Sequence, residues 1–343
     1  MKKAIILFSL GGPNKLENVE PFLFNLFYDP AILNLPKIIR YPMAKLISKR
    51  RAPLTKRIYK EMGGSSPILK LTNGQAVELE NSLNSNQKDI FYRTFIVMRY
   101  WDPRASQIVK EVKKFNPEEV ILLPLYPQYS ATTSGSSINE WNEICKIENY
   151  NVKTSTICCY PIDENFITAH INEINKKIKN LNNFKLIFSA HGLPQKNIKQ
   201  GDPYQWQVEQ SVNKIVKNLN YNNLDWIISY QSRIGLLKWM SPSTDNVIIE
   251  NSKIGKHIVL VPIAFVSEHS ETLVELDIKY KKLATDNGCI QYTRVPALGT
   301  NEHFIKAMSE LIINKKNEYK LNENFYPPKI QCPSNFKRCH CLN

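Results

Sequence analysis

The stretch KLIFSAHGLPQKNIKQGDPY, residues 185–204, decides the fold that we expect for this chain. Its apolar start, Leu186 to Phe188, is typical of a buried parallel strand. Gly192 permits a sharp turn after the strand, and Pro194 cannot continue a ladder of backbone hydrogen bonds. His191 is therefore predicted at the carboxyl end of a strand, where open α/β sheets bind ligands. A histidine there can exchange a proton near neutral pH or bind a metal, and it can equally be a hydrogen-bonded structural residue.

Strand-like and helix-like segments alternate on both sides of this stretch. Strands are predicted at 3–10, 91–98, 119–126, 152–158, 185–190, 225–232, 257–265 and 289–295. Helices are predicted at 16–28, 40–62, 70–84, 104–115, 135–148, 164–180, after Pro203, at 244–253, from Glu268 to Thr285, and at 301–315. This βα repetition predicts an α/β protein with two Rossmann-like, doubly wound parallel-sheet domains facing each other across a cleft. We expect the domains at 1–155 and 156–300, a helical segment of about 301–330 that packs back on the first domain, and a Cys-rich tail at 331–343.

Composition narrows the classes of function. The 343 residues are 43% hydrophobic and 22% charged, which indicates a packed globular protein and excludes a disordered one. The net charge of +14 favours an acidic partner such as a nucleic acid, an anionic membrane surface or a polyanionic small molecule, although heavy use of Lys throughout explains part of it. The apolar run Ala4 to Leu10 is short and no small-residue cleavage site follows it, so it is interpreted as a strand and not as a signal peptide; no run reaches the ~18 residues of a membrane span. The seven cysteines lack the spacing of a disulfide scaffold, so we expect a reducing compartment.

A second informative stretch is VPIAFVSEHSETLVELDIKY, residues 261–280. On a helix, the spacing of Glu268, Glu271 and Glu275 places the three carboxylates on one face. Such a face is commonly just solvated, but it can also handle cations or protons. Because this helix begins after a strand, as the turn at His191 does, His191 and Glu271 are predicted to face each other as a metal-binding or proton-transfer pair.

Several segments together resemble the ferrochelatase family. They are LGGP near the N-terminus, YPQYS (126–130), SAHGLP (189–194), GDPY (201–204), YQSRIG (230–235) and SEHSETLVELD (267–277), and the resemblance runs from about residue 3 to about residue 310. It implies two Rossmann-like domains with a porphyrin cleft between them. It also implies insertion of ferrous iron into protoporphyrin IX to form protohaem, the last step of haem biosynthesis.

The resemblance assigns roles to individual residues. His191 matches the family's active-site histidine, Glu271 the carboxylate that pairs with it at the metal, and His269 and Glu275 supporting residues on the same helix. The predicted cleft residues are Arg99, Tyr100, Tyr126, Tyr204 and Trp239, and those predicted to meet the porphyrin propionates are Arg51, Ser66 and Ser232. The family often continues its acidic row one turn beyond Glu275, where this chain has Lys279, so a long carboxylate conduit is not expected.

The chemistry agrees with these residue types. Metallation removes two pyrrole protons and delivers one dehydrated cation, which calls for a base and for ligands that release Fe²⁺ readily. Histidine with glutamate meets both needs, whereas thiolates would hold iron too tightly. Aromatic walls suit the macrocycle, and basic residues suit its two carboxylates. Whether His191 takes the protons or delivers the metal stays open.

The tail contains three closely spaced thiols, Cys332, Cys339 and Cys341, which suggest a metal or Fe–S site that lacks one ligand. Some ferrochelatases hold a [2Fe–2S] cluster with three tail cysteines and one interior cysteine. The resemblance makes Cys158 the best interior candidate here, and zinc or free thiols are the alternatives.

Three rival functions follow from the same sequence. They are a chelatase for coproporphyrin or another tetrapyrrole, a porphyrin or haem carrier without catalysis, and a basic nucleic-acid-binding protein; the last lacks any recognised motif, and we expect no nucleic-acid partner. The basic, partly apolar segment 40–60 is interpreted either as a surface for an anionic membrane or as an ordinary solvated helix. We therefore expect a cytoplasmic protein, which under the first of these two interpretations also contacts the inner membrane peripherally.

Overall fold

The computed structural model describes residues 1–86, 89–179, 181–232, 235, 237–314, 325–326 and 332–340, with residues 86, 325 and 326 described by their backbone alone. The chain divides into two compact units. Unit 1 comprises Met1–Cys159 and Met308–Pro327, and unit 2 comprises Tyr160–Ala307 and Pro328–Asn343. We had expected the first boundary at residue 155 and a separate tail; here the division follows Cys159, and the tail belongs to unit 2.

Unit 1 is built on a five-stranded parallel sheet of order β2-β1-β3-β4-β9. Its strands are β1 (Lys2–Ser9), β2 (Phe91–Met98), β3 (Glu119–Pro124), β4 (Thr154–Ile157) and β9 (Phe325–Tyr326). The central strand β1 is buried from Lys3 to Ser9 and pairs with β2 and β3 on either side. This burial explains its nearly continuous apolar sequence.

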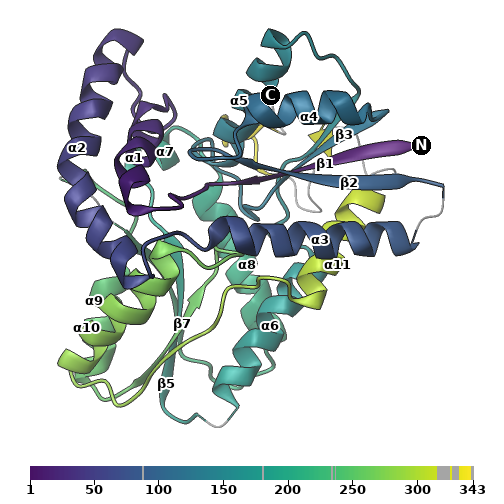
Figure 1. The fold of residues 1–343 in the computed structure, drawn as a ribbon. Coiled ribbons are helices and arrows are strands. Elements are labelled where there is room, and N and C mark those ends of the chain that lie inside the picture. The colour runs from purple at the N-terminus through teal and green to yellow at the C-terminus, as the bar shows by residue number, and fades with distance from the viewer. Residues whose placement is uncertain are drawn as a thin grey trace. The chain divides into compact units, whose positions relative to one another are not determined.

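The helices of unit 1 connect and cover these strands (Figure 1). They are η1 (Leu16–Asn18), α1 (Val19–Tyr28), α2 (Lys37–Glu61), α3 (Ile68–Asn86), α4 (Ala105–Phe115) and α5 (Ser134–Ile147). The apolar faces of α4 and α5, including Val109 and Trp141, pack with Ile6 and Leu122 in one core cluster. α1 and α2 form a second cluster around Tyr59 and Tyr100.

Unit 2 is built on a four-stranded parallel sheet of order β6-β5-β7-β8. Its strands are β5 (Phe184–His191), β6 (Trp226–Gln231), β7 (His257–Pro262) and β8 (Tyr292–Arg294). Its helices are α6 (Glu164–Ile178), α7 (Gln195–Lys199), α8 (Tyr204–Asn218), α9 (Thr244–Lys253), η2 (Glu271–Tyr280), α10 (Lys281–Asp286) and α11 (Glu302–Ile313), which ends in unit 1. The chain leaves β5 for β6 on one side and then crosses to β7 on the other. β5 is therefore the topological switch point, where α/β sheets bind ligands.

The predicted helix from Glu268 to Thr285 differs in type and start. Residues Glu271–Tyr280 form a π-helix, η2, which continues as α10, whereas Glu268 and His269 lie in the preceding loop. The expectation that Glu268 shares a helix face with Glu271 and Glu275 was therefore wrong. π-Helical segments are rare and frequently occur at functional sites.

Candidate functional site

Three parallel strands of unit 2 bring the predicted residues to one edge of the sheet. His191 is the last residue of β5, its partner across the ladder is Gln231 at the end of β6, and Ser232 follows directly. β7 ends at Pro262 and leads through the loop at His269 to Glu271, the first residue of η2. Because the carboxyl ends of parallel strands meet at one edge, residues about 80 positions apart in the sequence converge here.

The central pair is His191 and Glu271. Nε2 of His191 lies 3.5 Å from Oε1 of Glu271, and Nδ1 of His191 lies 2.7 Å from the carbonyl oxygen of Gly192. A carbonyl oxygen can only accept, so Nδ1 carries the hydrogen, and in the neutral ring Nε2 presents a lone pair. A lone pair and a carboxylate oxygen then face each other, which is favourable only when a cation or a proton lies between them.

The separation of the two atoms suits a shared metal. Two ligand atoms at about 2.1 Å from one cation and at a tetrahedral angle lie about 3.4 Å apart, close to the distance between Nε2 and Oε1. Both side chains are partly exposed, with 34% and 28% of their surfaces accessible, so solvent and cations can reach them. The geometry is therefore competent to bind a divalent cation and to accept a proton.

The neighbouring carboxylates are already occupied by donors. Glu275 accepts hydrogen bonds from the hydroxyl of Ser232 at 2.6 Å, from Tyr280 at 3.2 Å and from the Gln231 amide at 3.3 Å. Lys279, the residue that departs from the family pattern, lies 3.9 Å from Glu275 and is 69% exposed. Glu268 and Asp277 both bind Arg294. Of the acids at 268, 271, 275 and 277, Glu271 is the one whose carboxylate contacts His191.

His269 supports Glu271 from the loop before η2. Its Nδ1 accepts a hydrogen bond from the backbone N–H of Glu271 at 3.1 Å, and its ring lies edge-on to Phe265. Burial lowers the pKa of His269, Glu271 opposes that shift, and the positive charge of Arg294 adds to it. A neutral His269 is what the geometry requires, because Nδ1 must be unprotonated to accept.

Tyr204 and Trp239 lie beside the His191 turn. Burial raises the pKa of Tyr204, Tyr230 and Glu271 raise it further, and its hydroxyl contacts the main chain of His191, so the phenol stays neutral. Trp239 forms an isolated bridge with Pro194. A Cβ atom added to Gly192 would lie 2.9 Å from the carbonyl oxygen of Gln231, so close approach, and not a left-handed backbone, requires glycine there.

Comparison with known proteins decides the family. The family model for ferrochelatase matches residues 2–316. The chain belongs to the ferrochelatase family. The ferrochelatase of Pelagibacter ubique (strain HTCC1062) is 75% identical over the whole chain and 99% of its own length, and that of Rickettsia bellii (strain OSU 85-389) is 48% identical over 99% of this chain and 95% of its own length. The predicted function is therefore confirmed: this ferrochelatase-family chain is a porphyrin metal chelatase that inserts iron into porphyrin in haem biosynthesis.

Solved structures confirm the predicted chelatase-like fold. SirB from Bacillus subtilis with Fe³⁺ matches with a TM-score of 0.55 at 13% identity, covering 92% of this chain and 95% of that one. The sirohydrochlorin chelatase SirB from Bacillus subtilis subspecies spizizenii in complex with cobalt gives 0.54 at 14% identity, covering 93% and 99%. At this level of identity the likeness concerns the fold alone.

In this ferrochelatase-family chain, unit 1 carries two of the three residues predicted for the propionates, Arg51 and Ser66, and unit 2 carries the third, Ser232. Arg51 lies on α2 with its guanidinium 5.6 Å from the ring centre of Phe27, and burial lowers its pKa without removing its charge. No described carboxylate lies within ion-pair distance of Arg51. Ser66 lies against Gly12, where an added Cβ atom would be 2.5 Å from its hydroxyl oxygen. Arg51 thus carries a charge that no described acid neutralises.

The predicted cleft residues Arg99, Tyr100 and Tyr126 lie in a buried network of unit 1. Arg99 pairs with Asp29 at 2.9 Å and Glu140 at 3.0 Å, and it donates to Ser136 at 2.8 Å. Tyr100 is buried and donates to Asp29 at 2.7 Å, while burial raises the pKa of Tyr126. These contacts explain how the residues order unit 1; their contact with porphyrin stays a prediction.

The tail of the ferrochelatase-family chain packs on unit 2 next to the GDPY loop. Phe336 contacts Trp206 with ring centres 5.6 Å apart, and Arg338 donates its backbone N–H to Gly201 at 3.1 Å. Cys332 and Cys339 are both buried, and the Gln207 amide donates to the sulfur of Cys332 at 3.2 Å. The adjacent thiol of Cys339 and burial raise the pKa of Cys332. Cys341 lies outside the described residues, and Cys158 is buried in unit 1.

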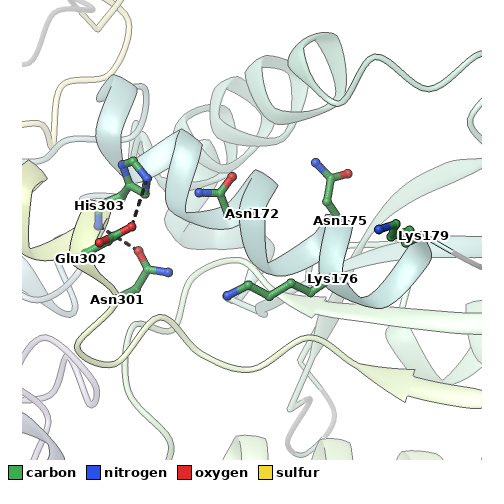
Figure 2. Close-up of a pocket in the computed structure, with 7 residues that line it drawn as sticks. All are labelled: Asn172, Asn175, Lys176, Lys179, Asn301, Glu302 and His303. Carbon is green, nitrogen blue, oxygen red and sulfur yellow. Dashed lines mark hydrogen bonds and ion pairs between the residues drawn. The ribbon is translucent and has the colours of Figure 1, made fainter.

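A separate pocket of about 390 Å³ lies between α6 and the start of α11. Figure 2 shows its lining, which consists of Asn172, Asn175, Lys176, Lys179, Asn301, Glu302 and His303. Lys176 and Asn301 both bind Glu173, at 2.7 and 2.9 Å, so much of this polarity is satisfied locally. None of the predicted site residues lines it.

Proposed function

We propose that His191 and Glu271 bind ferrous iron before it enters the macrocycle and then serve as acceptors for the pyrrole protons. The observation that carries this proposal is the 3.5 Å approach of Nε2 and Oε1, two acceptors with no described donor between them. Each turnover must remove two N–H protons from the porphyrin and add one Fe²⁺. When iron leaves the pair, the lone pair and the carboxylate become free to take up a proton in its place.

The reacting porphyrin in this proposal is protoporphyrin IX. Trp239 is partly exposed next to the turn after His191 and offers aromatic surface, which suits a large π system, while Tyr204 is buried beside His191. Arg51, Ser66 and Ser232 are proposed to meet the propionates, and the charge of Arg51 is the feature that supports this best, because carboxylates pair with guanidinium. Ser232 already donates to Glu275 on η2. A propionate bound to Ser232 would therefore be linked to the helix that carries Glu271.

We further propose that the tail cysteines hold a [2Fe–2S] cluster, with Cys332, Cys339, Cys341 and Cys158 as its ligands. Two of the four donors support this: Cys332 and Cys339 are buried side by side, and Gln207 donates to the sulfur of Cys332, a contact that would stabilise a thiolate. No group of three possible metal ligands comes together among the described residues, so Cys158 and Cys341 are proposed from the family resemblance. Zinc on the same thiols is the second candidate. The Fe–S cluster would take no direct part in metallation, because Fe²⁺ binding is assigned to His191 and Glu271.

The surface of α2 supports peripheral contact with an anionic membrane. Ile38 is 89% exposed and Leu54 60% exposed, with Ile39, Tyr41, Met43 and Leu46 exposed between them. Lys37, Arg40, Lys45, Lys49 and Arg50 lie on the same helix. None of the helices that the structure describes is long and apolar enough to cross a bilayer. A basic helix with exposed aliphatic side chains suits the surface of an acidic bilayer, so we propose a cytoplasmic protein at the inner membrane.

The role assignment is tested by turnover with Fe²⁺ and protoporphyrin IX. His191→Ala is expected to lose metallation while still binding porphyrin, as followed by porphyrin fluorescence. His257→Ala, which alters a histidine at the opposite end of a strand in the same sheet, is the matched control and is expected to stay active. A normal rate in His191→Ala would overturn the role of the pair.

A further inference from the structure

Arg294, at the end of β8, joins two acids of the segment that carries the metal pair. Its Nε and Nη2 atoms bind the two carboxylate oxygens of Asp277 at 2.5 and 2.7 Å. Its Nη1 atom binds Oε1 of Glu268 at 2.8 Å. All five N–H groups of a guanidinium lie in one plane, so one arginine can fix both partners in a defined geometry.

The two partners flank Glu271 in the sequence. Glu268 lies three residues before it in the loop, and Asp277 lies six residues after it in η2. Glu268 is tied down further, since its Oε1 also accepts the backbone N–H of Ala297 at 2.9 Å. Arg294 therefore links the loop before the π-helix to the helix itself, with Glu271 between its two partners in the sequence.

A π-helix needs such support. Its wider turn is uncommon in proteins and is seen mostly as short segments, so its start is set by tertiary contacts more than by intrinsic preference. Without Arg294, the negative charges of Glu268 and Asp277 would also lack a partner close to Glu271 in the sequence. The three carboxylates would repel one another, and a cation could bind Glu268 or Asp277 instead of Glu271.

We propose that Arg294 is a positioning residue for the iron substrate: by binding Glu268 and Asp277 it holds Glu271 opposite His191 and leaves Glu271 as the carboxylate open to the cation. Arg294 contacts neither iron nor porphyrin in this account. The proposal rests on the proposed pair of His191 and Glu271. Its effect is on the metal side of the reaction and not on the porphyrin side.

The test separates metal and porphyrin dependence. In Arg294→Gln we expect the KM for Fe²⁺ to rise about tenfold or more, with the KM for protoporphyrin IX within about twofold of the parent value. Arg294→Lys keeps the positive charge but cannot bind both acids through one planar guanidinium. Its KM for Fe²⁺ is expected to lie between those of the parent protein and Arg294→Gln. Lys185→Met, which breaks the ion pair with Asp225 in the same sheet, is the control for a simple loss of stability and is expected to leave both KM values unchanged.

Two further variants keep the outcomes distinct. If Arg294→Gln does not fold, Asp277→Asn is the substitute variant, because it removes the charge of one of the two acids that Arg294 binds. It is expected to raise the KM for Fe²⁺ about threefold. Glu271→Gln in the same assay tests the underlying pair. If Glu271→Gln changes the Fe²⁺ dependence and the Arg294 and Asp277 variants lose only melting temperature, Arg294 is not a positioning residue. If Glu271→Gln itself leaves the Fe²⁺ dependence unchanged, the pair is wrong.

Discussion

Nε2 of His191 and Oε1 of Glu271 lie 3.5 Å apart, although His191 ends strand β5 and Glu271 begins helix η2. The Gly192 carbonyl fixes the hydrogen of His191 on Nδ1, so that Nε2 presents its lone pair to Glu271. The fold thus creates an acceptor pair that a cation or a proton can complete. Donors bind Glu275, Asp277 and Oε1 of Glu268, and Oε2 of Glu268 is buried without a hydrogen-bond partner among the described residues.

The turn after β5 is expected to tolerate no side chain at Gly192. Gly192→Ala would push a Cβ atom to 2.9 Å from the carbonyl oxygen of Gln231 and would displace His191. We expect kcat/KM to fall by about tenfold or more, which corresponds to about 1.4 kcal/mol of transition-state stabilisation. Gly255→Ala strains a left-handed backbone position remote from the turn and is the control for lost stability. Equal activity of the two variants would show that the turn does not position His191.

Acid should destabilise the protein through His170. Burial lowers its pKa from 6.5 to about 3, and neither ring nitrogen has a hydrogen-bond partner among the described residues. Between these pH values the unfolded chain binds a proton that the native state excludes, so the free energy of unfolding falls as pH falls. The expected loss is about 1.4 kcal/mol per pH unit.

This contribution is measured by urea unfolding of the parent protein and of His170→Leu between pH 7 and pH 4. The variant is expected to show a shallower decline of unfolding free energy with falling pH. Parallel curves for the two proteins would contradict the assignment to His170.

The tail site should depend on Gln207. Gln207→Leu removes the donor to the sulfur of Cys332, and we expect iron and acid-labile sulfide per chain to fall by about half or more on anaerobic purification. Gln205→Leu alters a glutamine on the same helix that binds Glu209 and serves as the control. If the purified parent protein contains zinc instead of iron and acid-labile sulfide, the tail cysteines hold zinc and not a [2Fe–2S] cluster.

Exposed aliphatic residues of α2 should matter for membrane contact. Replacing Ile38 and Leu46 by glutamate removes apolar surface and adds negative charge. Co-sedimentation with vesicles of phosphatidylglycerol and phosphatidylcholine is therefore expected to fall about tenfold. Ile147→Glu, a change at a residue that is 64% exposed on α5, is the control. Undiminished sedimentation of the α2 variant would show that α2 is an ordinary solvated helix.

Much of the fold follows from local sequence. The strand at 91–98 and the helix at 244–253 were predicted with the bounds observed, because alternation of apolar segments and turn residues marks their ends. The π-helix could not be predicted in this way. We propose that its start depends on Arg294, which lies 17 residues beyond Asp277 and is placed next to β7 by the pairing of β7 with β8.

The candidate site also has a part that the sequence predicts and a part that it does not. His191 and Glu271 follow from the rule that strand ends converge, which needs no knowledge of side-chain contacts. The donors from Gln231 and Ser232 to Glu275, and from Arg294 and Ala297 to Glu268, are tertiary contacts without a local signal, so the sequence suggested three equivalent acids where the structure has one that contacts His191. Likewise, nothing near Arg99 in the sequence indicates that Asp29 and Glu140 already bind it.

The dependence of the initial metallation rate on Fe²⁺ concentration in Glu271→Gln tests the central claim most directly. The amide keeps the shape of the side chain but loses its charge, and Glu250→Gln, an exposed position on α9, is the control. We predict a rise of about tenfold or more in the KM for Fe²⁺ with unchanged affinity for protoporphyrin IX. An Fe²⁺ dependence identical to that of the parent protein would contradict the assignment of iron to His191 and Glu271.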